Sequence, residues 1–312
     1  MRLDKLLFVG ALILMAHSAS AGEPLDFDKL WDYGDPAATE EEFRGLLPAA
    51  EASGDRSYHT QLLTQIARTL GLQRKFAEAH AVLDGVEPLA TAELPVVRAR
   101  YLLERGRLFN SAGEPEKAVP LFKEAWDFGR AQGLDFYAVD AAHMLAIAEP
   151  SERQAAWNEK ALELAEASGD ERARNWLGSL YNNMGMTYLD QRRHEEALAI
   201  FEKGWEWRRR RDNAEATRVA KWCVGHALRK LERYEEALEL QRELEENSAA
   251  AEQPDGFVFE EIGECLLALD REEEARTYFR KAYAQLKEIG WIRESDPGRL
   301  ERLEKLAQQE ED

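Results

Sequence analysis

Side chains in spacings that support catalysis or metal binding are rare in this chain of 312 residues. It contains no Gly-rich phosphate loop, no His-Glu-x-x-His motif, no Cys-x-x-Cys pair and no Ser-centred nucleophile elbow. His194 precedes two glutamates at a predicted helix start, but the second His that a zinc site needs one turn later is missing. The remaining histidines after residue 21 are far apart and are interpreted as surface or groove residues: His59, His80, His143 and His226. We therefore predict no enzyme, no metal and no cofactor.

The only four-residue basic run, Arg208 to Arg211, follows a pair of tryptophans. Trp205 lies four residues after Phe201 and is expected in the core, whereas Trp207 points elsewhere. Cations in the last turn of a helix favour its dipole and can pair with neighbouring glutamates. A docking site for an acidic partner is the alternative interpretation of this run.

The strongest pattern in the chain is a pair of amphipathic helices predicted between Tyr181 and Trp207. A small residue on each helix, Gly185 and Ala197, lets the backbones come close, and aromatic residues one turn away fill the space around them. Two helices cannot bury this apolar surface alone, so the hairpin should repeat along the chain. The apolar positions of the hairpin are Tyr181, Met184, Gly185, Tyr188, Ala197, Phe201 and Gly204.

These positions resemble the tetratricopeptide repeat, whose signature has Gly and Tyr on the first helix and Ala and Phe on the second. The Gly and Ala positions recur twelve residues apart in five hairpins. A sixth fits with Gln154 and Asn158 in the Ala and Phe positions, its phase open to a shift of one turn. The resemblance implies an all-α, right-handed α-solenoid of about six tetratricopeptide-like helix hairpins with N- and C-terminal capping helices. The pairs are Ala67 with Ala79, Gly106 with Ala118, Ala142 with Gln154, Gly185 with Ala197, Gly225 with Ala237 and Gly263 with Ala275.

In this repeat family the first helices line a concave groove, and the resemblance places five positions per repeat on that face. Through the first five repeats they hold five basic residues against one acid, Asp190, whereas Glu260 and Glu264 reverse the sign in the sixth. We expect this face to bind a protein or extended peptide that bears carboxylates; a solvated face with accidental charge bias is the alternative. The partner-binding candidates are Arg68, Arg100, Arg107, Asn110, His143, Asn182, Met186, Trp222, His226, Arg229 and Lys230, and Ser179 shares the face.

Cys223 and Cys265, the only cysteines, lie on the first helices of adjacent predicted repeats. Their positions differ by about four residues, roughly 6 Å along a helix, whereas a disulfide needs Cα atoms within about 7 Å. We therefore expect two thiols, although the sequence leaves a bridge open in an oxidising compartment.

Both ends of the chain differ from the repeats. Arg2 and Lys5 precede an apolar run from Leu6 to Ala16 that is too short to span a bilayer, and Ala19-Ser20-Ala21 is a small-x-small cleavage pattern. These residues predict a signal peptide cleaved after Ala21 and export to the periplasm or the extracellular space, from a bacterial or a eukaryotic source. The predicted units are a signal peptide (1–21), an N-terminal capping unit (22–55), tetratricopeptide-like repeats (56–292) and a C-terminal capping helix with an acidic tail (293–312).

The formal net charge of −19 narrows the choice of partners. Such a surface repels phosphate backbones and anionic headgroups, so we expect neither nucleic acid nor membrane insertion. We predict an exported protein-protein interaction module or assembly scaffold. Two other classes remain: an extracytoplasmic small-ligand receptor, which needs a deep closed pocket, and a helical-superhelix cell-envelope enzyme, which needs a globular block outside the repeats. The sequence names neither the partner nor the oligomeric state.

Overall fold

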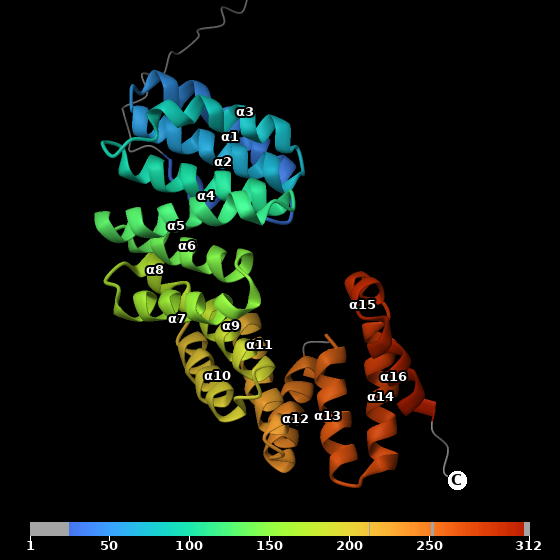
Figure 1. Cartoon of the computed structure of the whole chain (residues 1–312). Coiled ribbons are helices and arrows are strands. Elements are labelled where there is room, and N and C mark those ends of the chain that lie inside the picture. The colour runs from blue at the N-terminus through green and yellow to red at the C-terminus, as the bar shows by residue number, and fades with distance from the viewer. Residues whose placement is uncertain (1–24, 212, 251–252, 309–312) are drawn as a thin grey trace, which may run out of the picture.

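The computed structural model describes residues 25–211, 213–250 and 253–308, and within these ranges the chain forms helices and no strand (Figure 1). The predicted signal peptide and the acidic residues 309–312 lie outside the described residues. No helix of the described part is long and apolar enough to cross a membrane. The helices are η1 (Phe27–Leu30), α1 (Pro36–Ala52), α2 (Arg56–Leu72), α3 (Phe76–Val86), η2 (Glu87–Leu89), α4 (Pro95–Ser111), α5 (Pro115–Gln132), α6 (Asp135–Ala148), α7 (Ser151–Ala167), α8 (Glu171–Arg174), α9 (Leu177–Asp190), α10 (His194–Arg209), α11 (Ala214–Lys230), α12 (Tyr234–Ala250), α13 (Gly256–Ala268), α14 (Glu272–Leu286), α15 (Gly290–Ser295) and α16 (Pro297–Gln308).

Close helix contacts form at the glycines that the repeat pattern singled out. A Cβ added to Gly185 of α9 would lie 2.3 Å from a ring carbon of Phe201 on α10. Gly106 faces Phe122 in the same way at 2.5 Å, and Gly263 faces Phe279 at 2.7 Å. Because no side chain fits these gaps, the predicted register of these hairpins is confirmed.

Helices α6 and α7 form the hairpin that has Gln154 and Asn158 in the Ala and Phe positions. Ala142 is fully buried on α6, and Asn158 is buried on α7, where its amide donates to Thr187 at 3.4 Å. The buried faces therefore match the predicted phase. The short helix α8 is inserted before α9 and accounts for the long spacing between Ala142 and Gly185.

The turns inside five of the six hairpins share one backbone feature, which the turn between α6 and α7 lacks. Four non-glycine residues have φ between 57° and 62°, and each lies seven residues after the Gly or Ala position of its hairpin. This left-handed residue ends the first helix and directs the chain into the second. The residues are Arg74, Arg192, Glu232 and Asp270, and Gly113 takes the same place after Gly106 with φ 82°.

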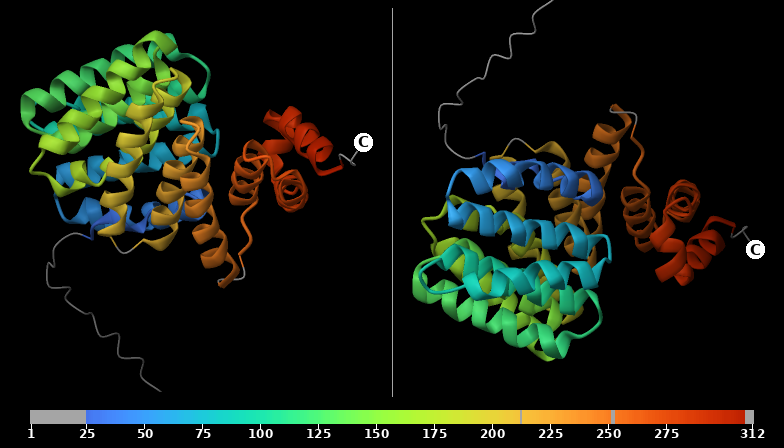
Figure 2. Two further views of the ribbon diagram at one scale, coloured as in Figure 1. Left: turned by 90° about the horizontal axis from the view of Figure 1, so that it is seen from below. Right: turned by 90° about the horizontal axis from the view of Figure 1, so that it is seen from above.

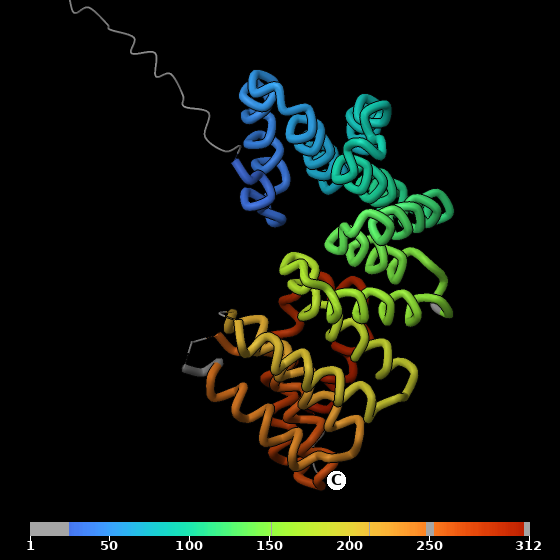
Figure 3. Tube along the Cα trace, turned by 90° about the vertical axis from the view of Figure 1, so that its left-hand side faces the viewer, coloured from blue at the N-terminus to red at the C-terminus, as the bar shows by residue number. Residues whose placement is uncertain are grey.

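The hairpins stack into a curved solenoid. Helices α1 to α7 form successive layers, α9 to α12 continue the stack, and α13 to α16 stand to one side (Figure 1). The stack bends along its length, so the N-terminal and C-terminal helices do not lie along one straight axis (Figures 2 and 3). The curvature brings Arg172 of α8 within 3.3 Å of the Asp28 carboxylate in η1, 144 residues away in sequence. At the other end α16 packs on α14 and buries Leu303 completely.

Candidate functional site

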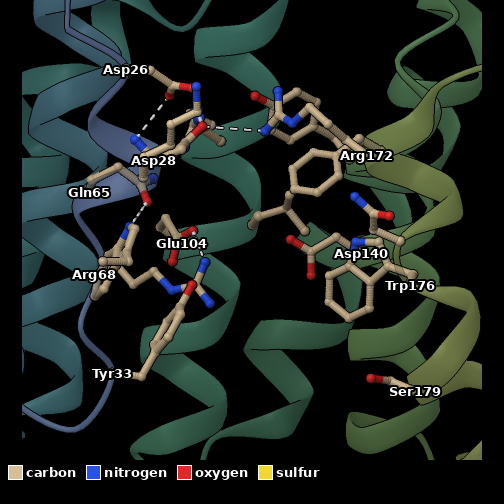
Figure 4. Close-up of a pocket in the computed structure, with 17 residues that line it drawn as sticks. Asp26, Asp28, Tyr33, Gln65, Arg68, Glu104, Asp140, Arg172, Trp176 and Ser179 are labelled. Carbon is tan, nitrogen blue, oxygen red and sulfur yellow. Dashed lines mark hydrogen bonds and ion pairs between the residues drawn. The ribbon is translucent and has the colours of Figure 1, made fainter. Parts of the chain in front are cut away.

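A cavity of about 730 Å³ lies between the first helices of the N-terminal hairpins and the segment that precedes α1 (Figure 4). Its walls come from η1, α2, α4, α6, α8 and α9, together with residues that flank η1 and residues that precede α9. Five aromatic side chains line it: Trp31, Tyr33, Phe136, Tyr137 and Trp176. Its charged lining is balanced, with four acids (Asp26, Asp28, Glu104 and Asp140) and four bases (Lys29, Arg68, Arg100 and Arg172).

The segment from Leu25 to Tyr33 forms one wall by folding along α2. Phe27 is buried against Phe43, with ring centroids 6.1 Å apart. The indole of Trp31 donates to Gln65 at 3.1 Å, and the Tyr58 hydroxyl donates to the Leu25 carbonyl at 2.8 Å. The sequence placed these residues in an N-terminal capping unit, and the structure adds that they border the cavity.

Arg100 of α4 is buried against this wall and is 5% exposed. One terminal nitrogen of its guanidinium binds the Asp28 carboxylate, and the group lies over the rings of Phe27 and Tyr137 at 5.3 and 5.5 Å. Burial opposes its charge, but Tyr137 and Asp28 raise the pKa of Arg100 above its ordinary value. Its Nε has no hydrogen-bond partner among the described residues. Arg100 is therefore charged, buried and incompletely satisfied.

A second group of charges joins three helices along the same face. Arg68 of α2 lies 3.5 Å from Glu104 of α4, and Glu104 accepts a hydrogen bond of 2.8 Å from Arg107. Arg107 also binds Asp140 of α6, and its side chain is 14% exposed. Burial opposes the charge, yet the two carboxylates raise the pKa of Arg107. This network holds neighbouring first helices in register.

The middle of the predicted groove face carries partner-binding candidates other than Arg and Lys. The His143 ring lies 5.1 Å from Trp176, and burial lowers its pKa, which favours the neutral form. Asn182 accepts a hydrogen bond from the Cys223 thiol at 3.2 Å. Met186 is exposed, and Asn110 is partly exposed. These residues lie outside the wall formed by Leu25 to Tyr33.

The C-terminal half of the face contains a separate cluster around Glu261 of α13. Its carboxylate accepts two bonds from Arg229, at 2.7 and 2.8 Å, and lies 2.8 Å from His226 Nδ1. Burial opposes ionisation, but His226 and Arg229 lower the pKa of Glu261 to about 2. Trp222 stacks on His226 with centroids 5.0 Å apart, and Lys230 is exposed. The predicted residues thus form two groups along the solenoid, not one continuous site.

Acids that lie outside the predicted face positions pair with four of the five bases on this face, Arg68, Arg100, Arg107 and Arg229. Glu104, Asp140 and Glu261 each lie two residues before the Gly or Ala position of their hairpin, a position that the sequence analysis left out of the face. Glu260 and Glu264, which were expected to make the sixth repeat acidic, pair with bases of α16. A polar residue or Cys stands at that position in every hairpin and was the missed pattern: Gln65, Glu104, Asp140, Asn183, Cys223 and Glu261.

The other candidates for chemistry have structural surroundings. Cys223 and Cys265 are buried free thiols, and burial raises the pKa of each to about 12. In the basic run Arg209 and Arg210 pair with Glu206, and Arg211 pairs with Glu171, which supports the interpretation by internal pairing. No group of three or more His, Cys, Asp or Glu side chains in the described part of the chain could hold a metal ion.

Comparison with known proteins identifies the repeat. Residues 176–250 match the family model of the tetratricopeptide repeat. No curated protein matches the sequence. The quorum sensor NprR from B. thuringiensis, in its apo form, is similar in structure with a TM-score of 0.57 and 16% identity over 90% of this chain and 78% of NprR. BtubC (BKLC) from P. vanneervenii is similar with a TM-score of 0.54 and 17% identity over 74% of this chain and 95% of BtubC. The fold is that of a tetratricopeptide-repeat solenoid.

Proposed function

We propose that this tetratricopeptide-repeat protein is an exported binding module whose concave face holds an extended segment of another protein. The observation that supports it is the cavity itself, because it combines aromatic walls with hydrogen-bonding side chains on the face formed by the first helices. Aromatic anchors in a pocket provide affinity, and polar groups fix the register of a bound backbone. Export is part of the proposal and rests on the signal-peptide pattern of residues 1–21.

Photo-crosslinking in the native envelope tests this function. A photoreactive amino acid replaces Ser179, which lines the cavity, and a matched variant carries it at Glu163, an exposed position of α7. We expect Ser179 to capture one protein that Glu163 does not capture, with the contact mapped to a single linear segment by mass spectrometry. Equal capture at both positions would contradict a groove function.

A small-ligand receptor is the second candidate: the volume of the cavity favours it, although the cavity is open to solvent and not the closed pocket that such a receptor needs. Its volume of about 730 Å³ falls within the range of roughly 300 to 1,000 Å³ that small-molecule sites occupy. Native mass spectrometry of the purified protein separates the two functions, because a resident small molecule would add a fixed mass, which is lost on unfolding. The scaffold function predicts no such mass.

A further inference from the structure

The Leu25 to Tyr33 segment borders the cavity and packs on the surrounding helices as a bound peptide would. It is short, it has only one turn of 3-10 helix, and it contacts α1, α2, α4 and α8 through its side chains. Its anchors are two aromatic residues and one carboxylate: Phe27, Trp31 and Asp28.

This segment packs on the helix that follows it, since Phe27 and Trp31 contact Phe43 of α1, but it does not supply the cap of that helix. Asp35 caps α1 with its own carboxylate, which accepts from the Ala38 amide at 3.0 Å, and Pro36 begins the helix. Both features stabilise a helix start without help from earlier residues. The start of α1 therefore does not depend on the residues before Gly34, whereas Phe43 stays covered only while aromatic side chains occupy the positions of Phe27 and Trp31.

The contact between Asp28 and Arg100 leaves one donor of the guanidinium unpaired among the described residues. Asp28 binds one terminal nitrogen of the guanidinium and divides its carboxylate between Arg100 and Arg172, whereas Arg100 Nε has no partner among the described residues. A guanidinium binds a carboxylate best through two parallel hydrogen bonds. A carboxylate that reached both Nε and the terminal nitrogen would satisfy a buried donor that the chain itself leaves unpaired.

We infer that Leu25 to Tyr33 is an internal occupant of the groove, which an extended peptide displaces by placing an Asp or Glu on Arg100 and aromatic side chains in the positions of Phe27 and Trp31. This inference rests on the proposed function, since it names the chemistry of the partner segment and the step that opens the site. The tethered segment competes at an effective concentration in the millimolar range, which keeps weak ligands out.

A labelled synthetic peptide with the sequence of residues 25–34 tests the displacement on the full chain. The binding variant is Asp28→Asn with Trp31→Ala, which removes two anchors of the internal segment but no residue of the opposing walls. Asp28→Asn alone is the second variant, because it keeps the side-chain shape if the double variant does not fold. The matched control is Asp26→Asn, two residues earlier and with a half-exposed side chain.

Fluorescence polarisation should show at least ten-fold tighter binding of the peptide to the variant than to the native chain or the Asp26→Asn control. Hydrogen exchange of residues 25–33 should increase in the variant and fall again on addition of peptide. A peptide that carries Asn in place of Asp28 and Ala in place of Trp31 should not bind.

Three results would overturn the inference. Equal affinity of the peptide for the native chain and the variant would show that the segment does not compete for the groove, although the groove would still bind peptide. Unchanged hydrogen exchange in both variants would make the segment a permanent wall of the cavity. Release of the segment without peptide binding would exclude acidic aromatic peptides as the ligand. Capture of the native partner from Ser179 does not use this peptide, so none of these results decides the proposed function.

Discussion

Removal of Asp140 should destabilise the solenoid far more than removal of an exposed acid. Asp140 pairs with Arg107, which also donates a hydrogen bond of 2.8 Å to Glu104, and the side chains of both acids are less than 7% exposed. At an effective dielectric constant of about 20, two charges about 4 Å apart attract each other by about 4 kcal/mol. Removing one member of a buried pair costs about 3 to 5 kcal/mol, because the other charge stays buried. Since Glu104 remains beside Arg107, we expect Asp140→Ala to cost about 3 kcal/mol.

Urea unfolding followed by circular dichroism measures this cost, and a double-mutant cycle assigns it to the pair. Arg107→Met with Asp140→Leu should cost less than the sum of the single variants, because no unpaired charge is left in the groove. The matched control is Glu124→Ala, which breaks a 2.8 Å pair with Arg98 in which both side chains are at least one third exposed; its cost should be at most about 1 kcal/mol. A cost below 1 kcal/mol for Asp140→Ala, or full additivity of the cycle, would refute the buried network as a source of register.

Three further experiments test other features of the chain. Gly185→Ala would place a Cβ 2.3 Å from the Phe201 ring and should lower the free energy of unfolding by about 1 to 3 kcal/mol. The control Gly45→Ala adds a Cβ with nothing within 4 Å and should raise the free energy of unfolding by up to about 1 kcal/mol. Similar melting temperatures for the two variants would contradict the register. Burial opposes ionisation of Glu261, but hydrogen bonds lower its pKa to about 2. The stability that the ionised Glu261 contributes is therefore complete above the unfolded pKa of about 4.3 and is lost as pH falls towards 2. Below pH 5 the melting temperature should decline more steeply for the native chain than for Glu261→Gln. N-terminal sequencing of the exported protein should begin at Gly22, and recovery of Met1 would contradict the signal peptide.

The repeat register was predictable because it depends on contacts that are local in sequence. Gly185 and Phe201 lie on the two helices of one hairpin, and their sizes are complementary, so spacing alone indicates that they meet. The same logic holds at the α6–α7 hairpin, where Asn158 takes the aromatic position and is still buried. Residue type was a weaker guide than position there, because the pattern of neighbouring repeats fixed the phase.

The charge state of the groove was harder to predict because it depends on contacts between repeats. Arg107 reaches Asp140 of the next first helix, and Arg229 reaches Glu261 in the same way. The choice of five face positions counted the bases but left out the acids two residues before the small position. The contact of Asp28 with Arg172 spans 144 residues and depends on the curvature of the solenoid. Curvature arises from many small rotations between repeats, which no single repeat sequence specifies.

The salt dependence of partner binding distinguishes two mechanisms. In one, a carboxylate of the partner replaces that of Asp28; in the other, unpaired cations of the groove attract the partner. Four acids and four bases line the cavity, so replacement of the Asp28 carboxylate by one from the partner leaves the number of ion pairs unchanged. The long-range contribution is then repulsion between an acidic peptide and a chain of net charge −19. Added salt screens this repulsion, since the Debye length falls from about 10 Å at 0.1 M to about 3 Å at 1 M. The affinity of the native chain for its partner segment should therefore hold or rise across this range, and a ten-fold fall would show that unpaired cations recruit the carboxylate.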